Sequence, residues 1–305
     1  MKTPQGKVVL TTYRDNVLVA NTSTEPVKPD ISNIQPCNHE EADSRMILHA
    51  VDAYKQGYKR VMLYATDTDV LVLTIYTISQ FENCELWLAF GHAKHFRYIP
   101  AHLIATRLGK DVSFGLLFLH ALSGCDTVSA FAGIGKKTAF TLFITLPHLL
   151  PVFKRFSSPL LSVTDEDFKV VERYIILLYS KTSSHASVNE ARKHLFSQGN
   201  RQIENIPPTR CALVEHVNRA VYQAGHIWGQ AMIANPELPN PSDWGWIKNN
   251  DTWVPFWSSL PEAAKSCREL IKCNCKNTCS GRCKCIKANL LCTQLCHCEG
   301  LCVRE

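Results

Sequence analysis

The chain has 305 residues, 46% of them hydrophobic, and a formal net charge of +6. This composition is that of a globular protein with a sizeable core, and the length allows one large domain or two ordinary ones. No apolar stretch reaches the roughly 18 residues that span a bilayer, so we expect a soluble protein with no membrane partner. The start of the chain has no apolar signal-peptide core, which predicts an intracellular protein with reduced thiols.

The N-terminal region, residues 1–37, is expected to form a small β element and a connector. Residues 7–13 and 17–21 are rich in valine and leucine, and a short polar stretch separates them. This pattern is typical of two strands joined by a turn. The residues that follow, up to 36, are polar and contain proline, which favours a connector.

A helix is predicted over about residues 39–56, because Asn38 can act as its N-cap with Glu41 three residues later. Its first turn carries several carboxylates. On a regular helix Glu41 and Asp43 lie about 200° apart, whereas Glu40 and Asp43 share a face. Glu40 could therefore replace Glu41 beside Asp43, and a solvated acidic first turn that favours the helix dipole is the alternative interpretation.

Two aspartates follow the next predicted element, a buried parallel strand over residues 61–65. In extended backbone Asp67 and Asp69 point the same way, at the edge where open α/β sheets bind ligands. The alternative is that Asp69 only caps the helix predicted over residues 70–79.

A glycine-rich turn is expected to bind phosphate further along the chain. Before it we predict strands at 86–90 and 95–99 and helices at 101–108 and 113–122. Asp126 then precedes Gly133-Ile134-Gly135-Lys136-Lys137. The glycines Gly133 and Gly135 let backbone N–H groups approach a phosphate, and Lys136 and Lys137 add positive charge at a helix start. A plain helix-connecting turn is the alternative.

The order of these motifs resembles that of the flap-endonuclease (XPG-type) nucleases, which are PIN-like. The resemblance covers about residues 38–145 and is carried by EADSRMILHA, ATDTDVLVL and GCDTVSAFAGIGKKTA. It implies a PIN-like α/β domain over 38–150, with a parallel sheet, flanking helices and a helix-hairpin-helix. It also implies two Mg²⁺ or Mn²⁺ ions that hydrolyse a phosphodiester bond. The implied catalytic carboxylates are Glu41, Asp43, Asp67, Asp69 and Asp126. The implied DNA-binding residues are Gly133, Gly135, Lys136 and Lys137. The family carries further acidic residues before the first of these motifs, where this chain has only some forty residues, so either the chain is shortened from a longer parent or the first metal site is incomplete.

The region after the hairpin is predicted to be a helical extension, residues 151–235, followed by a tryptophan-rich connector, residues 236–262. The expected helices cover 165–180, 188–196 and 210–233, with a short one at 262–271. The tryptophans are Trp244, Trp246, Trp253 and Trp257. They could stack on single-stranded nucleic acid, but the few basic residues among them favour packing onto the helices. His39, His49, His92, His95 and His120 have no zinc-finger spacing and are interpreted as structural, as is Cys267.

The C-terminal module, residues 263–305, has nine of the fourteen cysteines of the chain within its residues 273–302. Thiols this dense with few apolar neighbours need a cross-link, and reduced thiols favour metal over disulfides. Three tetrahedral zinc ions need twelve bonds, which nine sulfurs supply if three of them bridge two ions. The repeated C-x-C resembles the tesmin/TSO1-like CXC zinc domain, whose relatives include DNA-binding chromatin proteins. A flexible cysteine-rich tail is the alternative. The predicted ligands are Cys273, Cys275, Cys279, Cys283, Cys285, Cys292, Cys296, Cys298 and Cys302.

Together these features predict a metal-dependent, structure-selective nuclease that acts on DNA and carries a zinc-binding tail. The expected location is the nucleus, and the expected partners are nucleic acid and chromatin proteins. The combination on one chain also resembles proteins of mobile-element origin. Two other functions remain open. One is a non-catalytic nucleic-acid or chromatin binding protein on a degenerate nuclease fold, and the other is a zinc-dependent interaction module that binds no nucleic acid.

Overall fold

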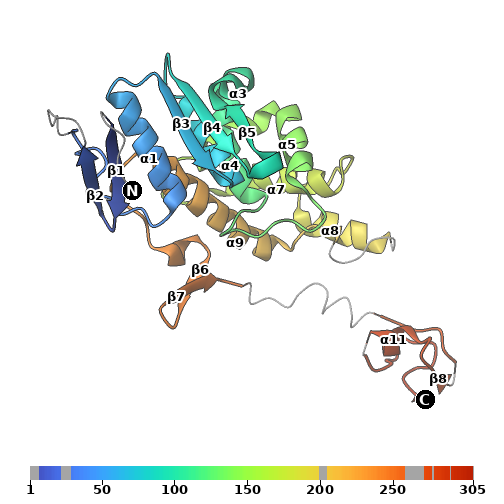
Figure 1. Ribbon diagram of the computed structural model, residues 1–305. Helices are drawn as coiled ribbons and strands as arrows, with labels where there is room; N and C mark the ends of the chain where they lie inside the picture. Colours follow the sequence, from blue (N-terminus) through green and yellow to red (C-terminus); the bar gives the residue numbers. More distant parts are fainter. Residues whose placement is uncertain are drawn as a thin grey trace.

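The computed structural model describes residues 7–21, 29–198, 205–257, 271–276, 278–288 and 290–304 (Figure 1). It is a mixed α/β protein with several small sheets and a cysteine-rich C-terminal region. Within the described residues, none of the helices has the length and apolar character needed to cross a membrane.

The N-terminal strands pair as an antiparallel hairpin, as expected. Strand β1 (Val8–Tyr13) and strand β2 (Asn16–Asn21) are joined by a tight turn in which Arg14 has a positive φ of 54°. Val17 of β2 packs with Ile34 and with Leu48 of the first helix. The hairpin is thereby attached to that helix, which lies between it and strand β3 in Figure 1.

The main sheet has three strands in the order β3-β4-β5. Strand β3 (Arg60–Ala65) is parallel to β4 (Glu85–Phe90), and β5 (Arg97–Pro100) is antiparallel to β4. The sequence predicted a buried parallel strand here. The parallel pairing is confirmed, but the prediction that the strand is buried was wrong for one of its faces. Leu63 points into the core, whereas Met62 and Tyr64 are more than half exposed, because β3 is an edge strand with one open face.

The first helix, α1 (Ala42–Lys55), begins later than predicted. Glu41, not Asn38, occupies the N-cap position, and its side chain makes no capping bond. The side chain of Asn38 instead donates to the carbonyl oxygen of Pro236, which removes it from the expected capping box. Helix α1 packs against β3 and against α2 (Thr68–Ile78), which follows the two aspartates.

The remaining helices pack around this layer. They are α3 (Ala101–Leu108), α4 (Lys110–Leu122), α5 (Lys136–Thr145), α6 (Leu150–Phe156), α7 (Asp165–Tyr179), α8 (Val188–Ser197) and α9 (Arg210–Val221). Short 3₁₀ turns occur at Ala93–His95 and Pro147–Leu149. The segment between α4 and α5 is a loop that contains Asp126 and the glycine-rich turn.

A single hydrophobic core joins the sheet region to the later helices. At its centre Phe118 of α4 makes edge-to-face contacts with Phe153 and Phe156 of α6, at centroid distances of 5.0 and 4.9 Å. Such pairs contribute about 0.5–1.5 kcal/mol each beyond their buried area. The residues predicted as a helical extension therefore share the core on which the sheet rests.

Helix α9 does not continue regularly to residue 233 as predicted. It changes into a π-helical segment, η4 (Tyr222–Ile227), and then a 3₁₀ turn, η5 (Trp228–Gln230). Glycine is needed in this stretch, because a Cβ on Gly225 would lie 2.6 Å from the carbonyl oxygen of Ser158. The wider turn changes the direction in which the following side chains point.

The tryptophan-rich segment contains a hairpin that the sequence analysis did not predict. After the 3₁₀ turn η6 (Pro241–Trp244), strands β6 (Trp246–Asn249) and β7 (Thr252–Pro255) pair in antiparallel fashion. Trp244 is buried in the core, as the packing interpretation expected. The helix predicted at 262–271 lies, except for its last residue, outside the described residues, as does Cys267.

The cysteine-rich region contains little regular structure. Strands β8 (Thr278–Cys279) and β9 (Val303–Arg304) form a short parallel pair, and α11 (Lys284–Lys287) is a single helical turn. Its buried cluster consists of cysteines, with Ile271 and Ile286 packed beside them.

Candidate metal centres

Three predicted aspartates converge at one end of the main sheet. One carboxylate oxygen from each of Asp67, Asp69 and Asp126 lies within 4.8 Å of the others. Asp67 follows the carboxyl end of β3, and Asp126 comes from the loop after α4, so segments nearly sixty residues apart meet here. Carboxylate oxygens are the ligands that hard divalent cations such as Mg²⁺ prefer, and this group could hold one.

The two aspartates after β3 have different backbone roles. Asp67 is the N-cap of α2, and its Oδ1 accepts a hydrogen bond from the backbone N–H of Asp69, at 2.9 Å. Asp69 lies in the first turn of α2, so the simple alternation of an extended strand does not apply to it. The predicted capping function is thus present, but Asp67 performs it and leaves Asp69 to face the cluster.

Asp69 is held by a histidine that the sequence analysis treated as structural. His120 Nε2 lies 2.6 Å from Asp69 Oδ1, and Lys136 Nζ lies 3.2 Å from His120 Nδ1. Since an ammonium group only donates, Nδ1 is the acceptor and Nε2–H donates to Asp69. This chain of contacts fixes the orientation of the Asp69 carboxylate.

Lys136 is directed towards this site. Its ammonium group also donates to the carbonyl oxygens of His120, at 3.0 Å, and of Gly124. Burial lowers the pKa of Lys136, and the negative charge of Asp69 opposes that change. The positive charge of Lys136 therefore offsets part of the carboxylate charge. Its hydrogen bonds to the two carbonyl oxygens also hold the start of the loop that carries Asp126.

Asp43 faces the same cluster from α1. Burial raises the pKa of Asp43, and the charges of Asp67, Asp69 and Asp126 raise it further. These contributions require Asp43 to lie near all three aspartates. Asp43 thus interacts electrostatically with the three aspartates, and of these four only Asp67, Asp69 and Asp126 lie within 4.8 Å of one another.

Both carboxylate oxygens of Glu41 accept hydrogen bonds from side chains. Gln223 Nε2 donates to its Oε1 at 2.8 Å, and Trp228 Nε1 donates to its Oε2 at 3.0 Å. Burial raises the pKa of Glu41, and these two hydrogen bonds oppose that rise. The π-helical turn after α9 brings both donors here, and an isolated polar residue in an apolar stretch was the only signal for Gln223.

The alternative ligand Glu40 points elsewhere. It is exposed, and its charge acts on Tyr222. Burial raises the pKa of Tyr222, and the negative charge of Glu40 raises it further. Glu41 instead interacts electrostatically with Asp43 and Asp69. Of the two glutamates, Glu41 is therefore the one beside the carboxylate cluster.

The glycine-rich turn precedes α5, as predicted. Gly133 has a φ of 73°, and the backbone N–H of Ile134 donates to the carbonyl oxygen of Phe131 at 3.0 Å. Gly135 is the N-cap of α5. Lys137 is exposed in the first turn of that helix, whereas the ammonium group of Lys136 is committed to the carboxylate side.

The cysteine-rich region contains three sets of four sulfurs, each within 4.8 Å of one another. The sets are Cys273, Cys285, Cys292 and Cys296; Cys273, Cys279, Cys292 and Cys298; and Cys273, Cys275, Cys279 and Cys283. Sulfurs of neighbouring ligands lie 3.5–3.9 Å apart. Tetrahedral zinc with bonds near 2.3 Å places its sulfurs about 3.8 Å apart, so these sets fit zinc.

Cys302 joins the same cluster. Its thiol interacts with those of Cys279, Cys292 and Cys298. All nine predicted cysteines are therefore in contact within one group.

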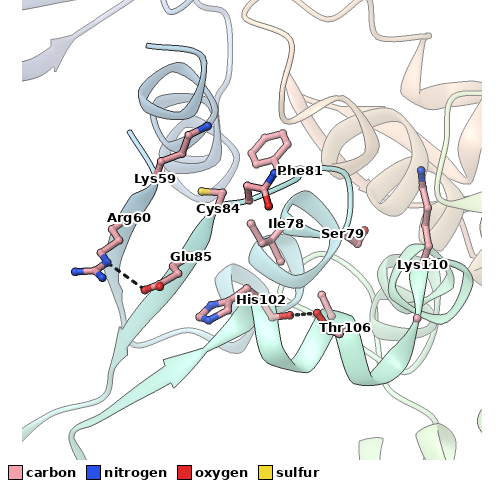
Figure 2. Close-up of a pocket in the computed structure, with 13 residues that line it drawn as sticks. Lys59, Arg60, Ile78, Ser79, Phe81, Cys84, Glu85, His102, Thr106 and Lys110 are labelled. Atoms are coloured by element: carbon pink, nitrogen blue, oxygen red, sulfur yellow. Dashed lines mark hydrogen bonds and ion pairs between the residues drawn. The ribbon is translucent and has the colours of Figure 1, made fainter. Parts of the chain in front are cut away.

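The described cavities differ in their relation to the carboxylates. A pocket of about 720 Å³ lies at the amino ends of β3 and β4, and its lining includes Lys59, Arg60 and Lys110 (Figure 2). Arg60 pairs with Glu85 there at 3.4 Å. This pocket is at the opposite end of the strands from Asp67. A second pocket, of about 550 Å³, includes Glu41 in its lining and so adjoins the carboxylates.

Comparison with known proteins adds no assignment. The sequence matches no family model, and no curated protein or solved structure is significantly similar to it. The two sites are consequently defined by their own geometry.

Proposed function

We propose that this chain is a divalent-metal-dependent nuclease that acts on DNA, built on a PIN-like domain and carrying a CXC zinc module. The observation that carries the proposal is the convergence of Asp67, Asp69 and Asp126 within 4.8 Å. Aspartates gathered from separate segments repel one another, and a cation removes that cost. The order of the motifs supports the choice of a phosphodiester substrate.

The residues around the carboxylates have defined tasks in this proposal. Bound Mg²⁺ or Mn²⁺ would activate water and stabilise the leaving oxygen of a phosphodiester. Asp67, Asp69 and Asp126 bind the cation, while His120 keeps Asp69 in position. Lys137 and the backbone of the glycine-rich turn, as the hairpin of a helix-hairpin-helix, contact a phosphate near the start of α5.

The zinc module is proposed to hold three ions. If Cys302 replaces Cys273 in the second sulfur set, each ion has four ligands. Cys273, Cys279 and Cys292 then each bridge two ions, and every cysteine is used. The module is structural in this proposal, and we expect the protein in the nucleus with DNA and chromatin proteins as partners.

One observation favours a second function, a non-catalytic nucleic-acid or chromatin binding protein. Both oxygens of Glu41 already accept hydrogen bonds, from Gln223 and Trp228. A second metal ion would have to displace or share these donors. A chain that keeps the fold without the full metal site would bind nucleic acid but not cut it.

Incubation with Mg²⁺ or Mn²⁺ and flap, bubble and single-stranded DNA separates the two functions, with matched RNA substrates as a further arm. The test variant combines Asp67→Asn with Asp126→Asn. The control combines Asp165→Asn with Asp251→Asn, whose side chains are 83% and 95% exposed. We expect cleavage by the wild type and the control and at least a hundredfold loss in the test variant. Binding without cleavage by the wild type under both metals would end the catalytic proposal.

A further inference from the structure

The second pocket has walls of an unusual kind, and we call it the aromatic pocket. It encloses about 550 Å³, and Tyr222, Trp246, Trp253, Glu41, Thr127 and Gln223 are among the residues that line it. Pockets of roughly 300–1,000 Å³ with aromatic walls and a few polar groups are typical small-ligand sites. The volume and the walls therefore suit a flat ring.

The hairpin of β6 and β7 supplies two of these aromatic walls. Trp253 pairs with Lys248 across the hairpin. Trp246 lies two residues before Lys248, so Trp246 and Trp253 share one face of the two-stranded ribbon. The four tryptophans of this segment thus occupy three environments. Trp246 and Trp253 line the pocket, Trp244 is buried in the core, and Trp257 is 74% exposed outside the pocket.

The polar groups of the pocket favour an uncharged ring over a phosphate. Among the described residues that line it there is no lysine or arginine, while Glu40 and Glu41 are present. Trp246 Nε1 is buried and has no hydrogen-bond partner in the described part of the chain. An unpaired buried donor is costly, and the described residues do not supply this indole with a partner.

The aromatic pocket adjoins the carboxylate cluster through two of its lining residues, Glu41 and Thr127. Glu41 belongs to its lining and interacts electrostatically with Asp43 and Asp69. Thr127, which also lines the pocket, directly follows Asp126 and donates to Gln223 Oε1 at 2.8 Å. A ring in the pocket would therefore be next to whatever the aspartates bind.

We propose that the aromatic pocket binds one nucleobase of a single-stranded segment, with the neighbouring phosphate at the divalent cation that Asp67, Asp69 and Asp126 would hold. The inference rests on the proposed function and names its substrate class, an unpaired nucleotide. Stacking on Trp246 and Trp253 holds the base irrespective of its identity, because every base has an aromatic face. The substrate is then selected by whether a base is free to leave its partner.

The test measures binding of short, fluorescently labelled single-stranded DNA and RNA by the full chain, with Trp253→Ala as the variant and Trp257→Ala as the matched control. We expect Trp253→Ala to weaken binding roughly tenfold and Trp257→Ala to change it less than about twofold, since stacking on one aromatic side chain contributes on that scale. Strands with an abasic nucleotide at each position in turn give the second readout. One abasic position should weaken wild-type binding roughly tenfold and should have little further effect in Trp253→Ala.

Equal effects of the two tryptophan variants, or indifference to every abasic position, would overturn the proposal and leave a protein side chain as the occupant to consider. A Trp253→Ala protein whose melting temperature falls is replaced by Trp253→Phe, which keeps a ring and should bind within about threefold of the wild type. Cleavage is assayed separately with Mg²⁺. Base-dependent binding without cleavage would contradict the nuclease proposal and leave the proposal of a nucleobase pocket standing. Cleavage that Trp253→Ala leaves unchanged would contradict the pocket proposal and leave the nuclease proposal standing.

Discussion

The two candidate metal sites of this protein are built in opposite ways. The nine cysteines lie within thirty consecutive residues, and their buried cluster consists of the cysteines themselves. The carboxylates come from the start of α1, the end of β3 and the loop after α4, and a large apolar core sets those elements relative to one another.

This difference determines what metal does in each place. A module without an apolar core would gain its folding free energy from metal–ligand bonds, so under the proposed function its fold would depend on zinc. The carboxylate cluster is assembled by packing elsewhere, which keeps like charges together whether or not a cation is bound. Under the proposed function, metal would be needed to fold the cysteine module, whereas the carboxylates are held in place before any cation binds.

Removal of zinc should therefore have the largest and most local effect. Apparent binding free energies for a structural zinc are about 10–16 kcal/mol, so a strong chelator should unfold the C-terminal module completely. The core that contains Phe118 and Phe153 does not depend on those sulfurs, and its melting temperature should stay within about 2 °C. Limited proteolysis and thermal melting report the two regions separately.

Metal content sharpens this comparison. Elemental analysis should give close to three zinc ions per chain, and a value near two would contradict the bridged arrangement. Cys211→Ser removes a thiol outside the cluster, so it should leave the zinc content unchanged and serves as the control. Melting of both regions on chelation would show that the second region also depends on zinc.

The second prediction concerns the packing that assembles the carboxylates. His216 of α9 is buried, with Nε2 2.9 Å from the carbonyl oxygen of Leu122 and Nδ1 3.3 Å from Ser129 Oγ. It thereby joins α9 to both ends of the loop segment that contains Asp126. Burial lowers the pKa of His216 to about 4, from an ordinary value of 6.5.

Because the folded pKa of His216 is depressed, protons bind preferentially to the unfolded chain. Stability should fall as the pH decreases from about 6.5 to about 4, by about 3 kcal/mol in all from this group. Chemical denaturation at several pH values measures this slope. His216→Gln should flatten it, whereas His148→Gln, at an exposed position, should not. An unchanged slope in His216→Gln would place the acid sensitivity elsewhere.

Sequence patterns recovered the local features of both regions. The cysteine cluster and the hairpin at Arg14 depend on residues close together in the sequence and were predicted, and the parallel strand β3 was predicted from its own apolar run. Asp67, Asp69 and Asp126 were also predicted, but as separate motifs, and only the fold brings their oxygens within 4.8 Å.

The contacts that surround the carboxylates could not be predicted in the same way. His120 is one of several scattered histidines in the sequence, and only the packing of α4 against α2 places it beside Asp69. Trp228 reaches Glu41 across nearly two hundred residues, through a π-helical turn that has no clear sequence signal. Asn38 was assigned as a cap because its pattern is local, but its partner, Pro236, is distant.

The smallest expected effect is on stability, and it comes from the repulsion among the ionised carboxylates of the cluster when no cation is bound. Burial raises the pKa of Asp43, and Asp67, Asp69 and Asp126 raise it further. A raised pKa means that the folded state binds the proton more tightly than the unfolded state does. The ionised Asp43 thus destabilises the metal-free fold as the pH rises above the ordinary value of 3.8, and this remains true at neutral pH.

Asp43→Asn should therefore raise the melting temperature at pH 7 without added Mg²⁺ by on the order of 1–2 °C, since Asp43 is partly exposed and solvent screens the repulsion. The advantage should disappear at a pH below the ordinary pKa of aspartate, where both proteins are neutral at this position. Added Mg²⁺ should stabilise the wild type more than Asp43→Asn, because a cation relieves the same repulsion. Asp251→Asn, on a side chain that is 95% exposed, controls for loss of charge alone. If Asp43→Asn instead lowered the melting temperature, Asp43 would be held by a favourable contact, and the carboxylate cluster would be a self-sufficient structural network that needs no cation.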